Sequence, residues 1–314
     1  MAHGGGGNHA SHGMRLNVTQ NDTLYIAMPG YLGGEFKTAG IKWHGPNKVL
    51  PNNDADSHYV VILNREENGK PYALLRADVL TRYRTAGIAA LATKLLSYDK
   101  PQVLSVIGPG KINYLTSLFV LGQFKTIKKV LIKGRGLKSR ESYINGVKKA
   151  FNNVEIKDCD SLKDAVIDAD IILINPGLYF DKISDMPVIK PSWIKERSVY
   201  ICSSYANFSD KDIINNTINV CDLFASYESY EEELGYPAYR AYGTIGNRFA
   251  DLVIEKKLAK ESIIDLADIV AGKHASFDGK TIIFSSGGMS LEDIALGKYL
   301  YDKAITEHRG VELL

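Results

Sequence analysis

The chain has 314 residues, enough for one large domain or two of ordinary size. Hydrophobic residues make up 45%, which predicts a sizeable core and excludes a disordered chain. The 38 basic and 36 acidic residues leave a net charge of +2, so no overall field favours nucleic acid or anionic lipid. The three cysteines show no CxxC spacing, which indicates a reducing compartment and excludes a disulfide framework.

The start of the chain carries no targeting signal that we can identify. Residues 1–13 lack the apolar segment of a secretory signal, and no apolar run approaches the roughly 20 residues that span a bilayer. We therefore expect a cytoplasmic protein without a membrane partner. His3, His9 and His12 lie in this Gly-rich stretch, and we interpret it as a flexible end and predict no metal site.

Short apolar runs and one helical pattern organise the first third of the chain. Tyr25–Met28 and Tyr59–Leu63 predict strands joined by loops. A helix is expected over 85–96, because apolar residues recur there with helical spacing at Ile88, Leu91, Ala92 and Leu95.

The middle of the chain alternates short apolar runs with helical patterns. This alternation predicts a parallel sheet covered by helices on both faces. The expected strands are Val103–Ile107, Val130–Ile132, Ile171–Ile174 and Val199–Cys202. Near the end, Thr281–Phe284 predicts another strand, and Ser290 to Asp293 is interpreted as a capping box that opens a helix.

A glycine turn follows the strand Val103–Ile107 and precedes a predicted helix. Gly108 allows the tight turn, and Gly110 lets the backbone approach a pyrophosphate. The first helical residues, Lys111 and Ile112, would offer backbone N–H groups to that anion. We predict these four residues as dinucleotide contacts. The alternative is an ordinary turn between strand and helix, because Asn113 replaces the third glycine of the fingerprint.

The next turn favours NADP as the cofactor, with NAD as the alternative. It lacks the acidic residue that binds the ribose hydroxyls in NAD sites. Instead, Gly134 leaves space, and a basic cluster suits a 2′-phosphate: Arg135, Lys138, Ser139 and Arg140. A solvated basic turn without a ligand is the other interpretation.

Several segments together resemble the ornithine cyclodeaminase/mu-crystallin family. The match runs in order from about residue 15 to residue 304, with Gly108–Gly110 at the family's dinucleotide turn. The segments are MPGYL at 28–32, AGIKW at 39–43, LTRYRTAG at 80–87 and IFSSGGMSLED at 283–293. Residues 28–34 and the pair Lys42-Trp43 look most like the branch that oxidises N-(2-amino-2-carboxyethyl)-glutamate to release 2,3-diaminopropionate.

The resemblance implies an α/β fold and a homodimer. It implies a central Rossmann-type doubly wound parallel sheet, which we place at residues 96–274. It also implies an α+β substrate and dimerisation domain built from both chain ends, at residues 1–95 and 275–314.

The resemblance also implies an NAD(P)-dependent oxidoreductase acting at the C–N bond of a small amino acid or its imine. N-substituted amino-acid dehydrogenase and ketimine reductase are both open. In family members a lysine and two arginines gather the substrate carboxylate, and here Lys42, Arg84 and Arg15 match them. Charge-assisted donors suit that role. Lys42 is also the predicted catalytic residue, through proton transfer at a pKa lowered by burial.

Further residues are placed by the same resemblance. Thr85 would open the helix after Arg84 and meet a cofactor phosphate. Ser286 and Gly287 match positions near the nicotinamide and the substrate, respectively. Beside Lys42, Trp43 is a candidate pocket wall, and His44 either relays a proton or is structural.

The chain departs from the family at its catalytic aspartate. Ala206 or Asn207 stands there, and neither is a general base. Asp210 lies close by, but proximity alone does not make it the base. Ornithine cyclodeamination to proline and ammonia is therefore a weaker alternative, beside a non-catalytic NADPH-binding protein like mu-crystallin. The tyrosine-rich stretch over 227–242 is acidic, which argues against stacking on nucleic acid.

Overall fold

The computed structural model describes residues 8–10, 14–18, 23–45, 59–177, 186–274, 277 and 279–312. The chain forms two compact units: a terminal unit of residues 1–84 and 288–314, and a central unit of residues 85–287. The chain passes from one unit to the other at two points. One lies inside helix α1 (Asp78–Leu96), and the other lies just after strand β16 (Thr281–Ser285). We predicted domain boundaries after residue 95 and before residue 275, whereas the two units divide after residue 84 and before residue 288.

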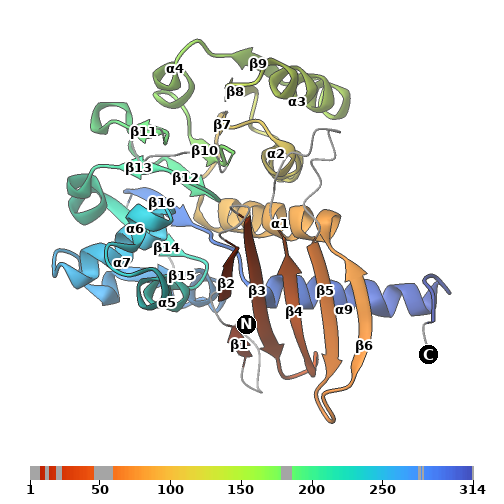
Figure 1. The fold of residues 1–314 in the computed structure, drawn as a ribbon. Coiled ribbons are helices and arrows are strands. Elements are labelled where there is room, and N and C mark those ends of the chain that lie inside the picture. Colours follow the sequence, from red (N-terminus) through yellow and green to blue (C-terminus); the bar gives the residue numbers. More distant parts are fainter. Residues whose placement is uncertain are drawn as a thin grey trace. The chain divides into compact units, whose positions relative to one another are not determined.

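The terminal unit is an antiparallel sheet with one long helix packed on it. The sheet runs in the order β1-β3-β4-β5-β6, with β2 also paired to β3. Its helix, α9 (Ser290–Thr306), packs across β3, β4 and β5 (Figure 1). The strands are β1 (Asn8–Ala10), β2 (Met14–Val18), β3 (Thr23–Leu32), β4 (Thr38–His44), β5 (Tyr59–Arg65) and β6 (Pro71–Arg76).

Two glycines let the start of α9 lie close against this sheet. Gly30 on β3 and Gly40 on β4 are paired directly across the two strands. A Cβ at Gly30 would lie 2.5 Å from the Oγ of Ser290, and one at Gly40 would lie 3.0 Å from Cγ1 of Ile294. Larger residues would therefore push the helix away.

The central unit is an eight-stranded parallel sheet in the order β9-β8-β7-β10-β12-β16-β14-β15. The strands besides β16 are β7 (Val103–Ile107), β8 (Lys129–Lys133), β9 (Glu155–Asp158), β10 (Ile171–Ile174), β12 (Val199–Cys202), β14 (Thr217–Cys221) and β15 (Ile263–Asp265). A short separate pair is formed by β11 (Val188–Ile189) and β13 (Asn207–Phe208).

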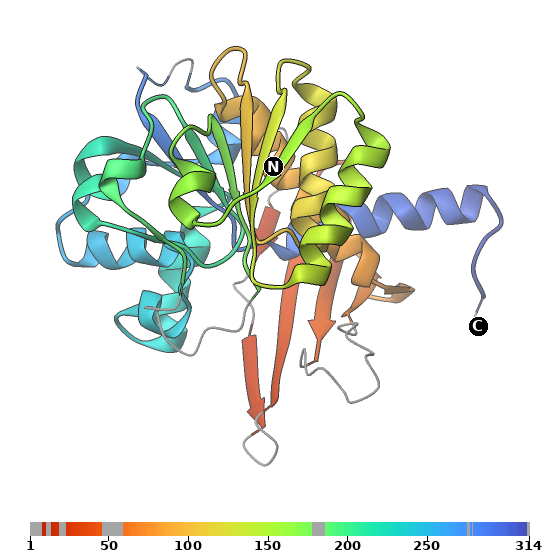
Figure 2. The ribbon, with the colours of Figure 1, turned by 90° about the horizontal axis from the view of Figure 1, so that it is seen from above.

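Helices cover both faces of this parallel sheet (Figure 2). One buried cluster joins the sheet to α4, α5 and α7, and the other joins it to the second half of α1 and to α2, α3 and α8. The predicted doubly wound parallel sheet is confirmed. The helices are α2 (Lys111–Gln123), α3 (Leu137–Ala150), α4 (Leu162–Val166), α5 (Phe224–Leu234), α6 (Ala238–Ala241), α7 (Ile245–Ile254) and α8 (Leu266–Val270).

Two predicted helix starts are wrong. Helix α1 begins at Asp78, so Thr85 lies inside the helix and does not offer a free helix N-terminus. The capping box is also wrong: Met289 is the N-cap of α9, and Ser290, already helical, donates its hydroxyl to the carbonyl of Pro29. Close packing of α9 on β3 uses the side chain that we expected to cap the helix.

Two expectations concern features outside the core of the fold. Among the described residues, no helix is both long enough and apolar enough to cross a bilayer. His9 lies in β1, whereas His3 and His12 fall outside the described residues.

The glycine turn lies where the strand order of the central sheet reverses, between β7 and β10. Gly108 has φ +80°, and its amide donates to the carbonyl of Lys133 at 2.8 Å. A Cβ there would lie 2.7 Å from the Cα of Pro176, just after β10. A Cβ at Gly110 would meet no atom within 4 Å. Gly108 is thus required by the backbone, while Gly110 leaves open space.

We predict that Gly108→Ala lowers the free energy of unfolding by about 1–3 kcal/mol, because it adds a Cβ to a left-handed backbone with no room. Gly110→Ala is the matched control and should change stability by less than about 0.5 kcal/mol. Urea titrations of both variants provide the measurement. Equal stability losses would contradict the assignment.

Candidate functional site

Two cations and two carboxylates form a buried cluster in the terminal unit, which we call the ion-pair cluster. Lys42 Nζ donates to Oδ2 of Asp293 at 2.8 Å. Arg84 donates from Nε to Oδ1 of Asp293 at 3.1 Å and from Nη1 to Glu292 at 2.8 Å. The hydroxyl of Thr81 lies 3.4 Å from the same Oδ1. Asp293 therefore joins both cations through its two oxygens.

Three elements bring these side chains together. Alternation along β4 buries Thr38, Gly40 and Lys42 on one face of the sheet. Arg84 comes from α1, while Glu292 and Asp293 stand in the first turn of α9, where the helix dipole favours negative charge. The close approach of α9 to the sheet carries its carboxylates to the lysine.

Burial makes each charge in the cluster depend on its partners. The side chains of Lys42 and Asp293 are 3% and 0% exposed. Burial, reinforced by the nearby charge of Arg84, lowers the pKa of Lys42 to about 8, although Asp293 acts in the opposite direction. For Arg84, burial alone would lower the pKa, but Asp293 and Glu292 raise it above its usual value. Arg84 is thus a permanent cation, whereas the pKa of Lys42 falls well below the usual range of a lysine.

The guanidinium of Arg84 occupies the space beside Gly288. This glycine has φ +77°, and a Cβ on it would lie 2.9 Å from Cζ of Arg84. Among the described residues, no acceptor is hydrogen-bonded to Nη2 of Arg84. The N–H groups of Nη2 are therefore not used within this cluster, and they lie on the edge by which a guanidinium grips a carboxylate.

The residues beside Lys42 on β4 differ in their surroundings. His44 lies on the same face of the strand, its ring centroid 4.8 Å from that of Tyr59, and burial lowers its pKa to about 4. It is therefore neutral at pH 7. Trp43 points to the opposite face, is 39% exposed and stacks on Tyr25 at 5.8 Å. Trp43 and Lys42 thus face opposite ways, as neighbouring residues on a strand do, and the role of Trp43 as a pocket wall stays a prediction.

Arg15, the predicted second arginine, lies in β2 opposite Ile26 of β3. Its side chain is outside the described residues. Its role in binding the carboxylate stays a prediction.

In the central unit, the predicted dinucleotide contacts lie around the turn after β7. Gly110 is the N-cap of α2 and makes no side-chain capping hydrogen bond. Because backbone N–H groups point toward the start of a helix, those of Lys111 and Ile112 point toward the turn. The side-chain amide of Asn113 donates to the carbonyls of Ile107 at 3.1 Å and Gly108 at 2.9 Å. Asn113, in the place of the third glycine, thus braces the turn.

The basic turn after β8 contains one structural arginine and two exposed cations. Arg140 pairs with Asp158 at 2.8 Å and donates to the carbonyl of Gly134 at 2.9 Å. A Cβ at Gly134 would lie 2.6 Å from Cδ of Pro109, so this glycine makes room for the neighbouring turn. Arg135 and Lys138 are exposed.

Ser139, the remaining residue of the predicted 2′-phosphate site, is also exposed. Its hydroxyl donates to the carbonyl of Gly136 at 2.8 Å, at the start of α3. The hydroxyl oxygen keeps lone pairs, but its hydrogen is already used by the backbone.

The remaining predicted contacts lie at two places in the central unit. Thr85 is half-buried within α1. Ser286 directly follows β16, and its hydroxyl donates to Asp222 at 3.2 Å. Gly287 comes next, and a Cβ on it would lie 3.3 Å from the hydroxyl of Tyr227.

The segment in which the resemblance places the family's catalytic aspartate, residues 202–210, has its one carboxylate engaged in an ion pair. Ala206 is buried, and its carbonyl accepts a hydrogen bond from Tyr239. Asn207 lies in β13. Asp210 is gripped by Arg248 through two hydrogen bonds of 2.9 and 2.6 Å. A carboxylate engaged in this way is a structural partner of Arg248.

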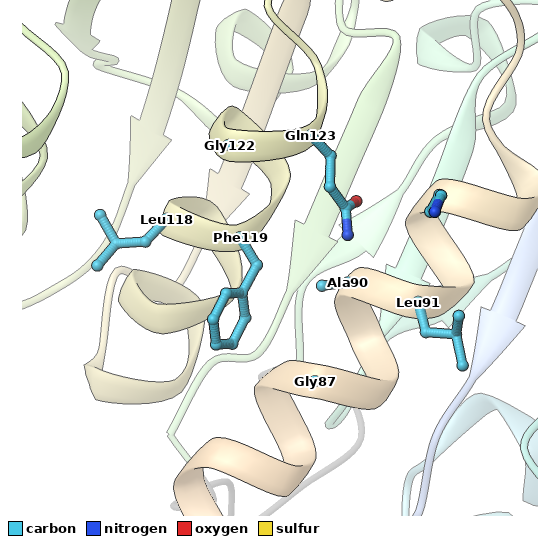
Figure 3. Close-up of a pocket in the computed structure, with 8 residues that line it drawn as sticks. Gly87, Ala90, Leu91, Leu118, Phe119, Gly122 and Gln123 are labelled. Atoms are coloured by element: carbon cyan, nitrogen blue, oxygen red, sulfur yellow. The ribbon is translucent and has the colours of Figure 1, made fainter.

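An open pocket of about 460 Å³ lies elsewhere in the central unit, between α1 and α2 (Figure 3). Phe119 projects from α2 into the space between the helices, opposite Gly87 and Ala90 of α1. The lining is mostly apolar and includes none of the predicted site residues. We therefore do not identify this pocket as the functional site.

Glu292 and Asp293 are the functional candidates that sequence reasoning missed. They were present in the last family segment but were interpreted as part of a capping box. One signal could have found them. If Lys42 and Arg84 are buried, as the resemblance implied, each needs a carboxylate partner, and the last family segment offers two.

The family match follows from the whole chain. The sequence profile of the ornithine cyclodeaminase/mu-crystallin family matches residues 3–308. The chain belongs to this family. It is 25% identical over 293 residues to N-((2S)-2-amino-2-carboxyethyl)-L-glutamate dehydrogenase of Staphylococcus aureus, covering 92% of this chain and 81% of the relative. The resemblance drawn from the motifs is thus confirmed.

Solved structures of the same fold extend the comparison. An archaeal alanine dehydrogenase dimer with bound NAD has a TM-score of 0.76 at 19% identity and covers 98% of this chain and 89% of its own. Δ1-Pyrroline-2-carboxylate reductase of Thermococcus litoralis, in complex with NADH and L-proline, has a TM-score of 0.75 at 22% identity, covering 98% and 90%.

Removing the shared carboxylate should be strongly destabilising. We predict that Asp293→Ala lowers the free energy of unfolding by about 3–5 kcal/mol, because two buried cations lose their common partner. The control is Asp302→Ala on the same helix, where the carboxylate is 53% exposed and pairs with Lys298. That change should cost less than about 1 kcal/mol. Chemical denaturation measures both, and a loss at Asp293 no larger than that at Asp302 would contradict the role of the shared carboxylate.

Proposed function

We propose that the protein is an NAD(P)-dependent oxidoreductase that acts at the C–N bond of a small amino acid or its imine. The observation that carries this proposal is the ion-pair cluster, in which Lys42 and Arg84 are buried and fixed by Asp293. Family membership supports the same chemistry, because the family includes dehydrogenases such as N-((2S)-2-amino-2-carboxyethyl)-L-glutamate dehydrogenase. Alanine dehydrogenase and Δ1-pyrroline-2-carboxylate reductase, which share the fold, act on similar small molecules according to their names.

The open edge of Arg84 is proposed to hold the α-carboxylate of the substrate. Two parallel N–H donors fix both the position and the plane of a carboxylate, which orients the adjacent α-carbon. Gly288 supports this role, because a side chain at that position would displace the guanidinium.

Lys42 is proposed to exchange the proton that accompanies hydride transfer. Reduction of an imine to an amine consumes one hydride and one proton, and oxidation releases both. The bound nicotinamide would supply or accept the hydride. A lysine with a pKa of about 8 is protonated at pH 7 and gives up its proton with little change in pH, which suits either direction.

The turn between β7 and α2 is proposed to hold the cofactor pyrophosphate. The absence of a Cβ at Gly110 leaves the backbone accessible, and the start of α2 has no side-chain cap competing for its N–H groups. We further propose NADP over NAD, since Arg135 and Lys138 are exposed at the turn after β8, where a ribose 2′-phosphate would lie.

We also propose a homodimer that uses the outer face of the antiparallel sheet in the terminal unit. That face carries an apolar row in which Ile41, Ile62 and Leu74 are paired across β4, β5 and β6. Leu74 is 63% exposed, and Trp43 shares the face. A second copy would cover this surface. The archaeal alanine dehydrogenase is itself described as a dimer.

The activity is tested by following reduced nicotinamide with panels of imino acids, and the reverse reaction with N-substituted and free amino acids. We expect turnover with at least one pair, and Arg84→Lys should lower kcat/KM by about 100-fold, because the bidentate grip is lost. Arg76→Lys, whose wild-type side chain is 70% exposed on β6, is the control and should retain activity.

Two results would reject this function. Ammonia release from ornithine without net change of cofactor would indicate a cyclodeaminase. Tight NADPH binding with no turnover across both panels would indicate a binding protein.

The coenzyme preference is tested with the double variant Arg135→Ala/Lys138→Ala. Loss of two phosphate partners should raise KM for NADPH by about 10-fold or more and change KM for NADH by less than about 2-fold. Lys148→Ala/Lys149→Ala, at the other end of α3, removes the same charge as a control. Equal effects on NADPH and NADH would contradict the 2′-phosphate site.

A further inference from the structure

A second buried polar cluster, in the central unit, is not used by the function proposed above. It consists of Asp222, Tyr227, Ser285 and Ser286, which we call the Asp222 cluster. Asp222 accepts hydrogen bonds from the Tyr227 hydroxyl at 3.0 Å and from the Ser286 hydroxyl at 3.2 Å. The hydroxyls of Ser285 and Tyr227 lie 3.2 Å apart. All four side chains are almost completely buried.

The direction of these hydrogen bonds is fixed by their outer partners. The backbone N–H of Gly246 donates to Ser285 Oγ at 2.9 Å, so the Ser285 hydrogen is available to Tyr227. Tyr227 in turn donates to Asp222. Burial, followed by the charge of Asp222, raises the pKa of Tyr227 well above its usual value, so the phenol keeps its proton. Ser286 also donates to Asp222, which leaves the oxygen of Ser286 able to accept.

The backbone is shaped to admit the tyrosine ring. A Cβ at Gly246 would lie 2.6 Å from Cδ1 of Tyr227, and one at Gly287 would lie 3.3 Å from its hydroxyl. These glycines belong to two segments far apart in sequence, one in α7 and one after β16. Both leave space for one ring, which sets the hydroxyl of Tyr227 against Asp222.

The cluster lies at the carboxyl ends of β14 and β16. Asp222 directly follows β14, and Ser286 directly follows β16. In a doubly wound sheet, ligands bind beyond the carboxyl ends of the strands, and a dinucleotide extends over both halves from the point where the strand order reverses. Gly108 follows β7 in one half, and β10, β12 and β16 continue into the other. Ser286 therefore stands at the edge where the second nucleoside would bind.

We propose that Asp222 and Tyr227 are positioning residues that orient Ser286 toward the nicotinamide end of the cofactor. This inference rests on the proposed function, because it requires a nicotinamide dinucleotide in the central unit. The Ser286 hydroxyl donates its hydrogen to Asp222. The lone pairs of the Ser286 oxygen then accept a hydrogen bond from the carboxamide N–H₂ of the nicotinamide. Tyr227 holds Asp222 in place, and neither residue touches the cofactor in this proposal.

The experiment compares ligands that contain or lack the nicotinamide. Wild type, Asp222→Asn and Tyr227→Phe are titrated with NADPH and with 2′-phospho-ADP-ribose, which lacks the ring, and with NADH and ADP-ribose in parallel. Both variants should weaken binding of the reduced dinucleotide by about 10-fold, the loss of one positioned hydrogen bond, and change binding of the ADP-ribose compound by less than about 2-fold.

Two further variants make the result decisive. Ser286→Ala should show the same selective loss, and it serves in place of Asp222→Asn if that variant does not fold. Tyr200→Phe removes another fully buried hydroxyl, on β12, and should leave both ligands unaffected. Thermal melting confirms that each titrated variant is folded.

The outcomes separate this inference from the proposed function. Equal weakening of both ligands, or no weakening of either, would overturn the positioning role while leaving a dinucleotide site. A wild-type protein that binds neither ligand would overturn the proposed function and this inference together.

Discussion

The terminal unit depends on the ion pairs that the carboxylate of Asp293 forms with Lys42 and Arg84. A charged lysine and a charged arginine are buried within reach of it, and each would be costly to bury without a partner. The carboxylate therefore ties β4, α1 and α9 together and at the same time fixes the two cations in space. Stability and the geometry of the candidate site come from the same few atoms.

The two units contribute different chemical resources. The terminal unit gathers charged side chains on a sheet and a helix brought close by Gly30 and Gly40. The central unit offers mainly backbone groups and buried hydroxyls at the carboxyl edge of a parallel sheet. Side-chain charge suits a small carboxylate, and backbone N–H groups suit a pyrophosphate. This division is consistent with one unit that holds a substrate and another that holds a dinucleotide.

The sequence predicted the central sheet well because its strands are short, apolar on both faces and bounded by clear turns. Val103–Ile107, Ile171–Ile174 and Val199–Cys202 match residue for residue. Strand β4 escaped prediction because its buried face carries Thr38, Gly40 and Lys42, which no apolar pattern marks. The roles of Glu292 and Asp293 were hidden for a related reason: their partners are distant in sequence, and only tertiary packing shows that they do not cap the helix.

The pairing of Lys42 with Asp293 joins residues 251 positions apart. During synthesis the central unit has its complete sequence before α9 leaves the ribosome, whereas the first sheet must wait for the final helix. Until α9 is present, Lys42 and Arg84 lack their carboxylate partners. Burying these charges without partners costs free energy, which opposes packing of that face of the sheet. Both cations therefore find their carboxylate partners only when α9 has been made and has packed on the sheet.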